Sequence, residues 1–192
     1  GLGDVYKRQE QGVQYLPLEE LRQQIGFVPQ KGVLFSGTIA SNLRFGNPDA
    51  SDAEIEQAAE IAQAMEFIGE KPDRFDSDIS QGGTNVSGGQ KQRLTIARAI
   101  AKHPKVFVFD DSFSALDLKT DAALRKALGE QVQDSTMIIV AQRISTILHA
   151  DNIIVLHEGE PVGIGKHEEL LENCPIYKEI YDSQTKEASE HE

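Results

Sequence analysis

The sequence predicts an α/β fold with a mostly parallel sheet flanked by helices. Short apolar runs alternate along the chain with longer segments of helical period, which is the order of strands and crossover helices in a parallel sheet. The run 106–109 is too uniformly apolar for a half-exposed strand, so we expect it inside the sheet. It ends in two adjacent carboxylates, Asp110 and Asp111, and ligands of open α/β sheets bind at that edge.

Composition sets limits on the class of protein. The chain has 192 residues, of which 39% are hydrophobic and 26% charged, as in a globular domain with its own core. Its net charge of -12 argues against nucleic acid as a partner, because such binding needs a basic surface. A basic strip of Lys91, Arg93 and Arg98 is still available for phosphates. A single cysteine, Cys174, indicates a reducing compartment.

The first half of the chain contains one strand and several helices. Residues 1–9 have no regular period, and we expect them to be a cloning or assembly scar. A short helix over 18–24 precedes a strand over 25–28, which Pro29 stops, and a loop over 30–37 follows.

The clearest helix before the acid pair covers residues 51–65. Ser51 and Glu54 have the spacing of a capping box at its start. The surrounding stretch 40–75 shows no strand pattern, and we expect an inserted α-helical subdomain over about 38–103.

The second half alternates between strands and helices. A loop over 73–86 leads into a helix over 89–102, which stops at His103-Pro104. A helix follows the acid pair, and a second buried strand follows that helix. The remaining predicted elements are a short helix, a third strand, a hairpin turn, two helices and a frayed polar tail. These elements cover residues 118–132, 136–141, 144–148, 153–157, 158–164, 167–172, 175–183 and 184–192.

Two motifs indicate phosphate chemistry. In Ser87-Gly88-Gly89-Gln90, glycines allow close approach of an anion to the free N–H groups of a helix start. A plain helix cap explains that tetrapeptide alone equally well. Asp110, at a strand end, is the type of residue that holds Mg²⁺ in nucleotide hydrolases, with Asp111 in the place of a base. The alternative, solvated acids at a strand exit, is disfavoured because both motifs and the sequence SALD occur together.

With these motifs in order, the chain resembles the nucleotide-binding domain of an ABC transporter. The resemblance covers about residues 14–183, which we expect within a domain of residues 10–183. It rests on four motifs and on a segment typical of the exporter branch. They are the signature at 86–93, the Walker B strand at 106–111, the D-loop at 114–117, the Q-loop at 25–30, and the exporter-like segment 33–48.

The resemblance implies ATP and Mg²⁺ as cofactors. Asp110 would hold Mg²⁺, and Gln30 would contact both Mg²⁺ and the attacking water. Ser87, Gly88 and Gly89, with Gln90 completing the motif, would grip the γ-phosphate of an ATP bound mainly by a second nucleotide-binding domain.

The resemblance also implies partners and a location. Asp117 would lie at the interface with the second domain, and residues 73–84 would face the coupling helices of a transmembrane domain. The chain would then work on the cytoplasmic side of the cell membrane, as part of an integral membrane transporter. No apolar run approaches the ~18 residues of a membrane span.

Three departures from the family pattern modify this expectation. The phosphate loop G-x-x-x-x-G-K-[ST] does not occur in the sequence, so we expect a domain truncated before the Q-loop, without Walker A. Asp111 stands where hydrolysing members carry glutamate. Gln142 stands where they carry a switch histidine, and glutamine cannot carry the imidazole's proton.

Together the two substitutions resemble the degenerate half of a heterodimeric exporter of the multidrug or lipid type. In that case, Asp111 and Gln142 would belong to a site that hydrolyses ATP slowly. Three alternatives remain open: a competent ATPase subunit of a homodimeric exporter, a soluble ABC-type ATPase acting on DNA or ribosomes, and a non-catalytic dimerisation module.

The lack of the phosphate-loop pattern generates a prediction. Its lysine and backbone N–H groups supply most nucleotide affinity, so the isolated 192-residue chain should bind ATP weakly or not at all and should be inactive. Isothermal titration calorimetry tests this, and a Kd of about 1 mM or tighter would contradict it.

Overall fold

A computed structural model of the chain describes residues 7–8, 11–12, 17–132 and 134–190. Side chains are described for residues 17–132 and 134–186. The chain divides into two compact units, Gly1–Val140 and Ala141–Glu192, and each unit is described by itself. No helix of the described part is long and apolar enough to cross a membrane.

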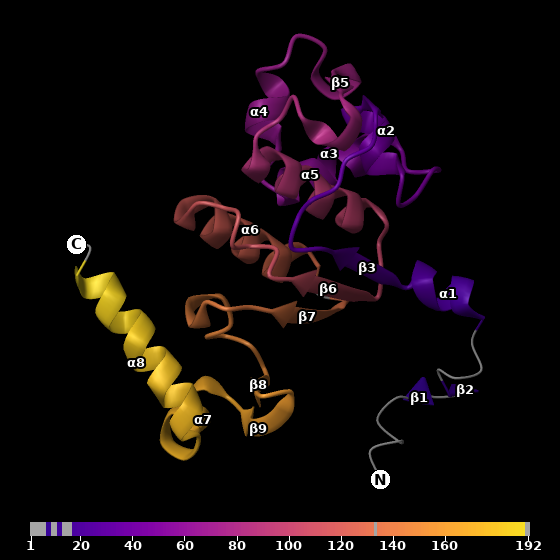
Figure 1. The fold of residues 1–192 in the computed structure, drawn as a ribbon. Helices are drawn as coiled ribbons and strands as arrows, with labels where there is room; N and C mark the ends of the chain where they lie inside the picture. Colours follow the sequence, from indigo (N-terminus) through magenta and orange to yellow (C-terminus); the bar gives the residue numbers. More distant parts are fainter. Residues whose placement is uncertain (1–6, 9–10, 13–16, 133, 191–192) are drawn as a thin grey trace. The chain divides into compact units, whose positions relative to one another are not determined.

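The first unit is built on a parallel sheet, as the sequence predicts. Strands β3 (Ile25–Val28), β6 (Val106–Asp110) and β7 (Thr136–Val140) lie in the order β3-β6-β7 (Figure 1). Both pairs are parallel, with Val28 opposite Phe109 and Asp110 opposite Val140. The carboxyl ends of all three strands therefore lie at one edge of the sheet.

Helices cover one face of this sheet. Phe107 and Phe109 alternate along β6 with less buried residues, and both belong to the main core. In that core they join apolar residues of α5 (Gly88–Ala101) and α6 (Leu118–Gln131). Ridges of apolar side chains at helical spacing, such as Leu94 and Ala97 in α5, explain why these segments fold as helices on the sheet.

The opposite face of the sheet is open among the described residues. Phe27 and Val108 lie in register with Ile138. Phe27 is 56% exposed and Ile138 50% exposed. The prediction of a buried strand over 136–141 is therefore wrong for β7, because β7 is an edge strand of the described sheet and four of its five residues are exposed.

The amino-terminal part contains short elements. β1 (Lys7–Arg8) pairs antiparallel with β2 (Gln11–Gly12), and α1 (Leu18–Gln23) leads into β3 as predicted. The stretch 1–9, expected to be a scar, lies outside the described residues apart from β1.

A group of helices lies between β3 and α5 in the sequence. They are α2 (Ile39–Arg44), α3 (Asp52–Ile61) and α4 (Met65–Gly69), with the short turns η3 (Arg74–Asp76) and η4 (Gln81–Gly83). A two-stranded pair, β4 (Gly37–Thr38) and β5 (Asp78–Ile79), joins the two ends of this segment. Apolar side chains of these helices belong to the main core together with those of α5, and the helices lie beside α5 (Figure 1).

The helix predicted over 51–65 is two helices. α3 ends at Ile61, and α4 begins at Met65. Gln63, between them, has a φ of 56°, which lies in the left-handed region that interrupts a right-handed helix. Its carbonyl is held by the guanidinium of Arg93, whose Nη1 donates to it at 2.6 Å.

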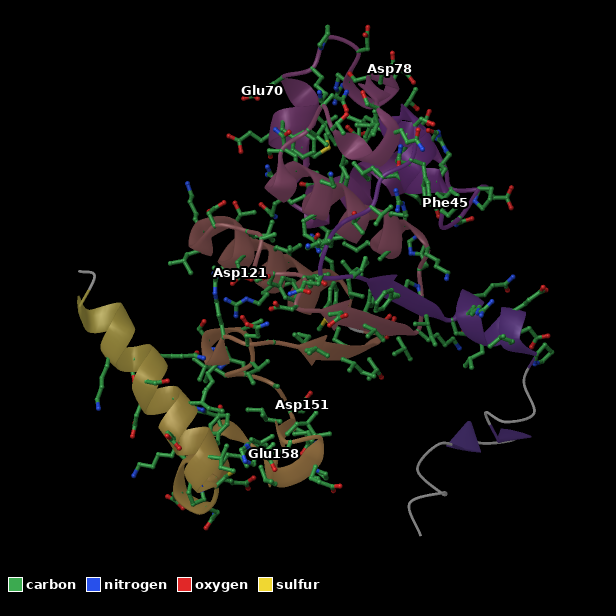
Figure 2. All side chains as sticks on the ribbon, in the orientation of Figure 1. Phe45, Glu70, Asp78, Asp121, Asp151 and Glu158 are labelled. Atoms are coloured by element: carbon green, nitrogen blue, oxygen red, sulfur yellow. The ribbon has the colours of Figure 1, made fainter. Side chains whose placement is uncertain are left out.

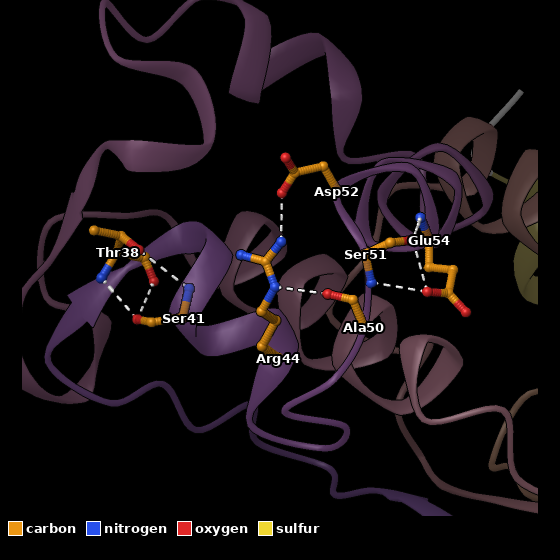
Figure 3. Close-up of polar contacts among 7 residues, drawn as sticks. All are labelled: Thr38, Ser41, Arg44, Ala50, Ser51, Asp52 and Glu54. Atoms are coloured by element: carbon orange, nitrogen blue, oxygen red, sulfur yellow. Dashed lines mark hydrogen bonds and ion pairs between the residues drawn. The ribbon is translucent and has the colours of Figure 1, made fainter.

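Two capping boxes fix the starts of α2 and α3 (Figure 3). Ser41 N donates to Thr38 Oγ1 at 3.1 Å, and Thr38 N donates to Ser41 Oγ at 2.9 Å. Ser51 N donates to Glu54 Oε2 at 2.8 Å, and Glu54 N donates to Ser51 Oγ at 3.3 Å. The capping box predicted from the sequence is thus present.

Arg44 links the two helices (Figure 3). Its Nε donates to the carbonyl of Ala50 at 2.8 Å, and its guanidinium pairs with Asp52 in the first turn of α3. The hydroxyl of Ser51 also donates to the Glu54 carboxylate. The hydrogen bonds from the hydroxyl and the backbone N–H of Ser51 lower the pKa of the Glu54 carboxyl.

The second unit is a hairpin and two helices. After the turn η5 (Ile144–Thr146), β8 (Ile153–His157) pairs antiparallel with β9 (Glu160–Gly165) around Gly159, whose φ is 84°. This confirms the predicted hairpin. In the described residues the predicted third strand pairs only with β9, so it forms a separate sheet.

Helices α7 (His167–Asn173) and α8 (Pro175–Glu190) complete this unit. Cys174 is buried between them, in a cluster with Leu170 and Tyr177. The predicted helix end at Ser183 is wrong, since α8 continues to Glu190. Gln184 explains part of the extension, because its side chain donates to the carbonyl of Gln142 and accepts from Ile144 N.

The capping box of α3 generates a stability prediction. Replacing Ser51 with alanine should lower the free energy of unfolding by about 1 kcal/mol, because an orphan N–H of the helix start loses its acceptor. Ser80→Ala is the matched control, since Ser80 stands at the start of η4 without a side-chain cap. Chemical denaturation of both variants tests this, and equal losses would contradict it.

Candidate functional site

The acid pair lies at the carboxyl edge of the parallel sheet, as expected. Asp110 is the last residue of β6, and Asp111 follows it with a φ of 44°. Asp111 N donates to the carbonyl of Val140 at 2.9 Å, and Ser114 Oγ donates to the carbonyl of Asp111 at 2.8 Å. The backbone of Asp111 is therefore held on both sides in a conformation that aspartate tolerates better than most residues.

Ser112 anchors this turn to the neighbouring strand. Its side chain is fully buried, and Oγ donates to the carbonyl of Val28, at the end of β3, at 2.7 Å. Phe113 packs into the core against Phe109, with ring centroids 5.0 Å apart. These contacts fix the end of β6 against the end of β3.

Gln30 and Asp111 are brought into direct contact. Gln30 Nε2 donates to Asp111 Oδ2 at 3.1 Å, across 81 positions of the sequence. The parallel register explains the encounter, because Gln30 follows β3 just as Asp111 follows β6. Two of the residues predicted for one site therefore share one edge of the sheet with Asp110.

The sequence SGGQ forms the start of α5. Ser87 Oγ accepts from Gln90 N at 3.2 Å, and Ser87 N donates to Gln90 Oε1 at 3.0 Å, a capping box. The cap uses the hydroxyl of Ser87 as an acceptor, so its proton remains to be donated. The helix start thus has the cap that was considered for it, and its role in binding an anion stays a prediction.

The two glycines of this motif differ in their surroundings. A Cβ built at Gly88 would meet no heavy atom of the described chain within 4 Å, its own helix and neighbours aside. A Cβ at Gly89 would lie 3.6 Å from the carbonyl oxygen of Ala115, an ordinary contact. The helix start therefore lies beside the turn 114–117, and nothing in the described chain requires a glycine at position 88.

Asp117 has a structural task of its own. It caps α6, accepting from Thr120 N at 2.9 Å and from Thr120 Oγ1 at 2.6 Å. These hydrogen bonds lower the pKa of the Asp117 carboxyl, and the largest contribution comes from the hydroxyl of Thr120.

Burial lowers the pKa of Arg93, and the charges of Glu66 and Asp117 oppose this shift.

Gln142 belongs to the second unit and is described within that unit alone. Its carbonyl accepts from Gln184 Nε2 at 2.8 Å, and the residue comes directly before Arg143, the N-cap of η5. The structure thus brings Gln30, Asp110 and Asp111 together at one edge of the sheet. The SGGQ segment (residues 87–90) lies beside the turn that ends at Asp117. Gln142 belongs to the other compact unit.

The predicted basic strip is only partly available. Arg98 is half-buried, donating to Asn42 O and Asn42 Oδ1 at 2.8 and 2.7 Å and to Val33 O at 2.8 Å. It also lies over the rings of Phe35 and Phe45, the latter exposed at the end of α2 (Figure 2). Burial lowers its pKa to about 10. The prediction that Arg98 is free for phosphates is therefore wrong.

Two buried polar residues near the acid pair, Ser112 and Gln92, were given no role in the sequence analysis. Ser112 donates to the carbonyl of Val28, and Gln92 donates to the carbonyl of Pro29. A polar residue within the apolar stripe of a predicted helix could have indicated Gln92, because a buried polar group needs a partner.

Comparisons with known proteins show the family of this chain. The family model described as ABC transporter matches residues 3–114 of this chain, more than half of its 192 residues. The chain belongs to the ABC transporter family.

Individual ABC transporter relatives are close in sequence. An uncharacterized ABC transporter ATP-binding protein, YfiB of Bacillus subtilis, is 47% identical over 91% of this chain and 30% of its own length. A putative multidrug export ATP-binding/permease protein of Staphylococcus aureus is 42% identical over 85% of this chain and 28% of its own length. The chain thus spans about 30% of the length of these relatives.

A solved ABC transporter structure has the same fold. It is a bacterial Atm1-family ABC exporter with ATP bound, 35% identical to this chain with a TM-score of 0.87. The match covers 92% of this chain and 31% of that one. The α/β fold with a parallel sheet flanked by helices is thereby confirmed.

The open space at Gly88 generates a prediction. Gly88→Ala should change the free energy of unfolding by less than about 0.5 kcal/mol, because its methyl group meets nothing in the chain. Gly26→Ala is the contrasting variant, because its Cβ would lie 2.7 Å from Pro104 Cγ, and should cost about 1–3 kcal/mol. Thermal and chemical unfolding test both variants. A large loss of unfolding free energy in Gly88→Ala would contradict the conclusion that no contact of the described chain requires a glycine at position 88.

Proposed function

We propose that this chain is most of the nucleotide-binding domain of an ABC exporter, with residues 10–183 as its ATPase part and 38–103 as its helical subdomain. Two such domains would close on ATP at the cytoplasmic side of the membrane and drive export through transmembrane partners. The names of the relatives, which include an export ATP-binding/permease protein, and the fold shared with a solved exporter support this. Residues 73–84 would face the coupling helices.

The observation that carries the proposal is the open glycine at the start of α5. Gly88 is not required by any contact of the described chain, so its lack of a side chain suits close approach by an external group. The helix start offers N–H groups and a favourable dipole to an anion. Ser87, Gly88, Gly89 and Gln90 would therefore hold the γ-phosphate of an ATP carried by a partner domain.

The edge with Gln30, Asp110 and Asp111 would be the chain's own half-site. Mg²⁺ is usually bound by one or two carboxylates together with substrate phosphates and waters, and these two carboxylates with an amide fit that requirement. Within the described residues, no group of three or more His, Cys, Asp and Glu could hold a metal. When bound, Mg²⁺ would neutralise phosphate charge, while Asp110 would hold it and Gln30 would orient water.

One structural feature of this half-site and one departure in the sequence, at Gln142, support weak hydrolysis by this chain. Asp111 has a stem one methylene shorter than glutamate, and its backbone N–H and C=O are both bonded, so the chain cannot advance the carboxylate to compensate. A displacement of about 1 Å can cost 100-fold in rate. Gln142 can donate a hydrogen bond to a phosphate, but it cannot carry a proton as histidine does.

A competent homodimeric ATPase is the second candidate, and one observation favours it. The carboxylate of Asp111 is retained and accepts a hydrogen bond from Gln30 at 3.1 Å. A water held between these groups would still find an acceptor for its proton.

The two candidates predict different kinetics for the full-length transporter with its partner. In the degenerate-half reading, Asp111→Gln leaves most ATP turnover intact, whereas replacing the equivalent glutamate of the partner abolishes it. Ser87→Ala in this chain should then lower turnover by about 100- to 1000-fold, since it removes a hydrogen-bond donor at the partner's competent site. ATPase assays on the purified complex test this, and a large loss from Asp111→Gln would instead establish the competent reading.

A further inference from the structure

The segment that carries Gln142 is held by one side chain of helix α8. Gln184 donates from Nε2 to the carbonyl of Gln142 at 2.8 Å, and its Oε1 accepts from Ile144 N at 2.9 Å. All of these residues belong to the second unit. A single carboxamide therefore binds the backbone on both sides of Arg143, from 40 and 42 positions further along the chain.

This pair of hydrogen bonds, which we call the Gln184 clamp, replaces a strand partner. A glutamine side chain offers the same C=O acceptor and N–H donor as a peptide group, so it can bind an extended backbone as a neighbouring strand does. Residues 141–143 lie between β7 and η5, outside helices and strands. The clamp thus supplies hydrogen bonds that regular structure does not supply at this point.

The face of α8 that carries Gln184 is itself firmly supported. Tyr177, Tyr181 and Gln184 follow one another at helical spacing and so share one face of the helix. Tyr177 is 2% exposed, and its hydroxyl lies 2.8 Å from His167 Nδ1 at the start of α7. The rings of Tyr181 and His167 have centroids 5.2 Å apart. α8 is therefore a fixed support for the clamp.

Apolar packing also joins α8 to η5, but it does a different task. Ile144 is 5% exposed and belongs to the buried cluster of the second unit, against which Tyr181 packs. Apolar burial is non-directional, whereas a hydrogen bond needs its donor and acceptor aligned. The packing therefore keeps η5 near α8, and the clamp sets the orientation of the backbone at Gln142.

We propose that Gln184 is a positioning residue that orients Gln142 toward the nucleotide of this chain's own half-site. The inference rests on the proposed function, in which Gln142 donates a hydrogen bond to a phosphate there. Without the clamp, the backbone at Gln142 turns more freely and this hydrogen bond weakens. Helix α8 thereby helps to set how long ATP stays at a site that hydrolyses it slowly.

The test measures release of ATP from the full-length transporter with its partner. Turnover is not the readout, because the partner's site supplies most of it in the proposed function. The complex is loaded with radiolabelled ATP and chased with unlabelled ATP. The partner's site empties at each turnover, so a slow phase of release reports ATP kept at this half-site.

Gln184→Met keeps the length of the side chain and removes both hydrogen bonds of the clamp. It should speed the slow phase about three- to tenfold, the effect of one weakened hydrogen bond. An unchanged slow phase would overturn the proposal.

A double-mutant cycle with Gln142→Ala identifies the route of the effect. In the Gln142→Ala background, Gln184→Met should have no further effect on release, because its influence passes through the side chain of Gln142. A merely structural role for Gln184 predicts instead that the two factors multiply, and that result would also defeat the proposal.

Thr185→Ala is the matched control. Thr185 is the next residue of α8, but its Oγ1 donates to Tyr181 O within the same helix at 2.6 Å. The slow phase of this variant should keep its wild-type rate. Equal acceleration in Thr185→Ala and Gln184→Met would mean that any loss in α8 has the same effect, and the clamp would then have no special role.

Amide hydrogen exchange gives a readout that needs no nucleotide. Residues 142–146 should exchange faster in Gln184→Met than in Thr185→Ala, because the N–H of Ile144 loses its acceptor. Equal exchange in the two variants would overturn the proposal.

Failure of the degenerate-half assignment would look different. The wild-type complex would then show no slow phase, and Asp111→Gln would lose its turnover. The exchange pattern would remain as described, and the cycle between Gln184→Met and Gln142→Ala would be read in kcat, where independent factors would still overturn the positioning role.

Discussion

The hydrogen bond from Ser112 Oγ to the carbonyl of Val28 joins the ends of two parallel strands. This hydrogen bond fixes the position of Gln30, which follows β3, relative to Asp111, which follows β6. Because the serine is fully buried, water does not compete for either partner, and loss of the donor would leave a buried carbonyl unpaired. The edge geometry is therefore set by the interior of the first unit more than by the exposed groups.

Much of this fold follows from local sequence. The apolar run of β6 and the helical spacing of α5 and α6 each specify one element, since burial on one or both faces leaves a periodic signature. The features that differ from the sequence prediction depend on tertiary contacts and backbone conformation, which the local hydrophobic pattern does not carry. The apolar composition of β7 suggests burial, but its exposure follows from strand order, and the break at Gln63 depends on a left-handed residue.

The candidate site divides in the same way. The residues at the acid pair and in SGGQ could be named from motifs, because phosphate chemistry restricts residue type and spacing. The contact between Gln30 and Asp111 could not, because it joins positions far apart in sequence and needs the register of β3 on β6. Ser112 has no motif-level signal, and only its burial and its bond to the carbonyl of Val28 show what it holds. Gln92 lies within the signature motif, but its bond to the carbonyl of Pro29 depends on the folded chain.

The open face of the sheet has a consequence for the chain in solution. Phe27, Ile138 and Val140 present apolar surface that nothing in the described part covers, and such patches favour association between molecules. The net charge of -12 opposes that association through mutual repulsion at long range. Salt shortens the range of this repulsion to about 10 Å at 0.1 M and leaves apolar attraction intact, so ionic strength decides whether the isolated chain stays dispersed.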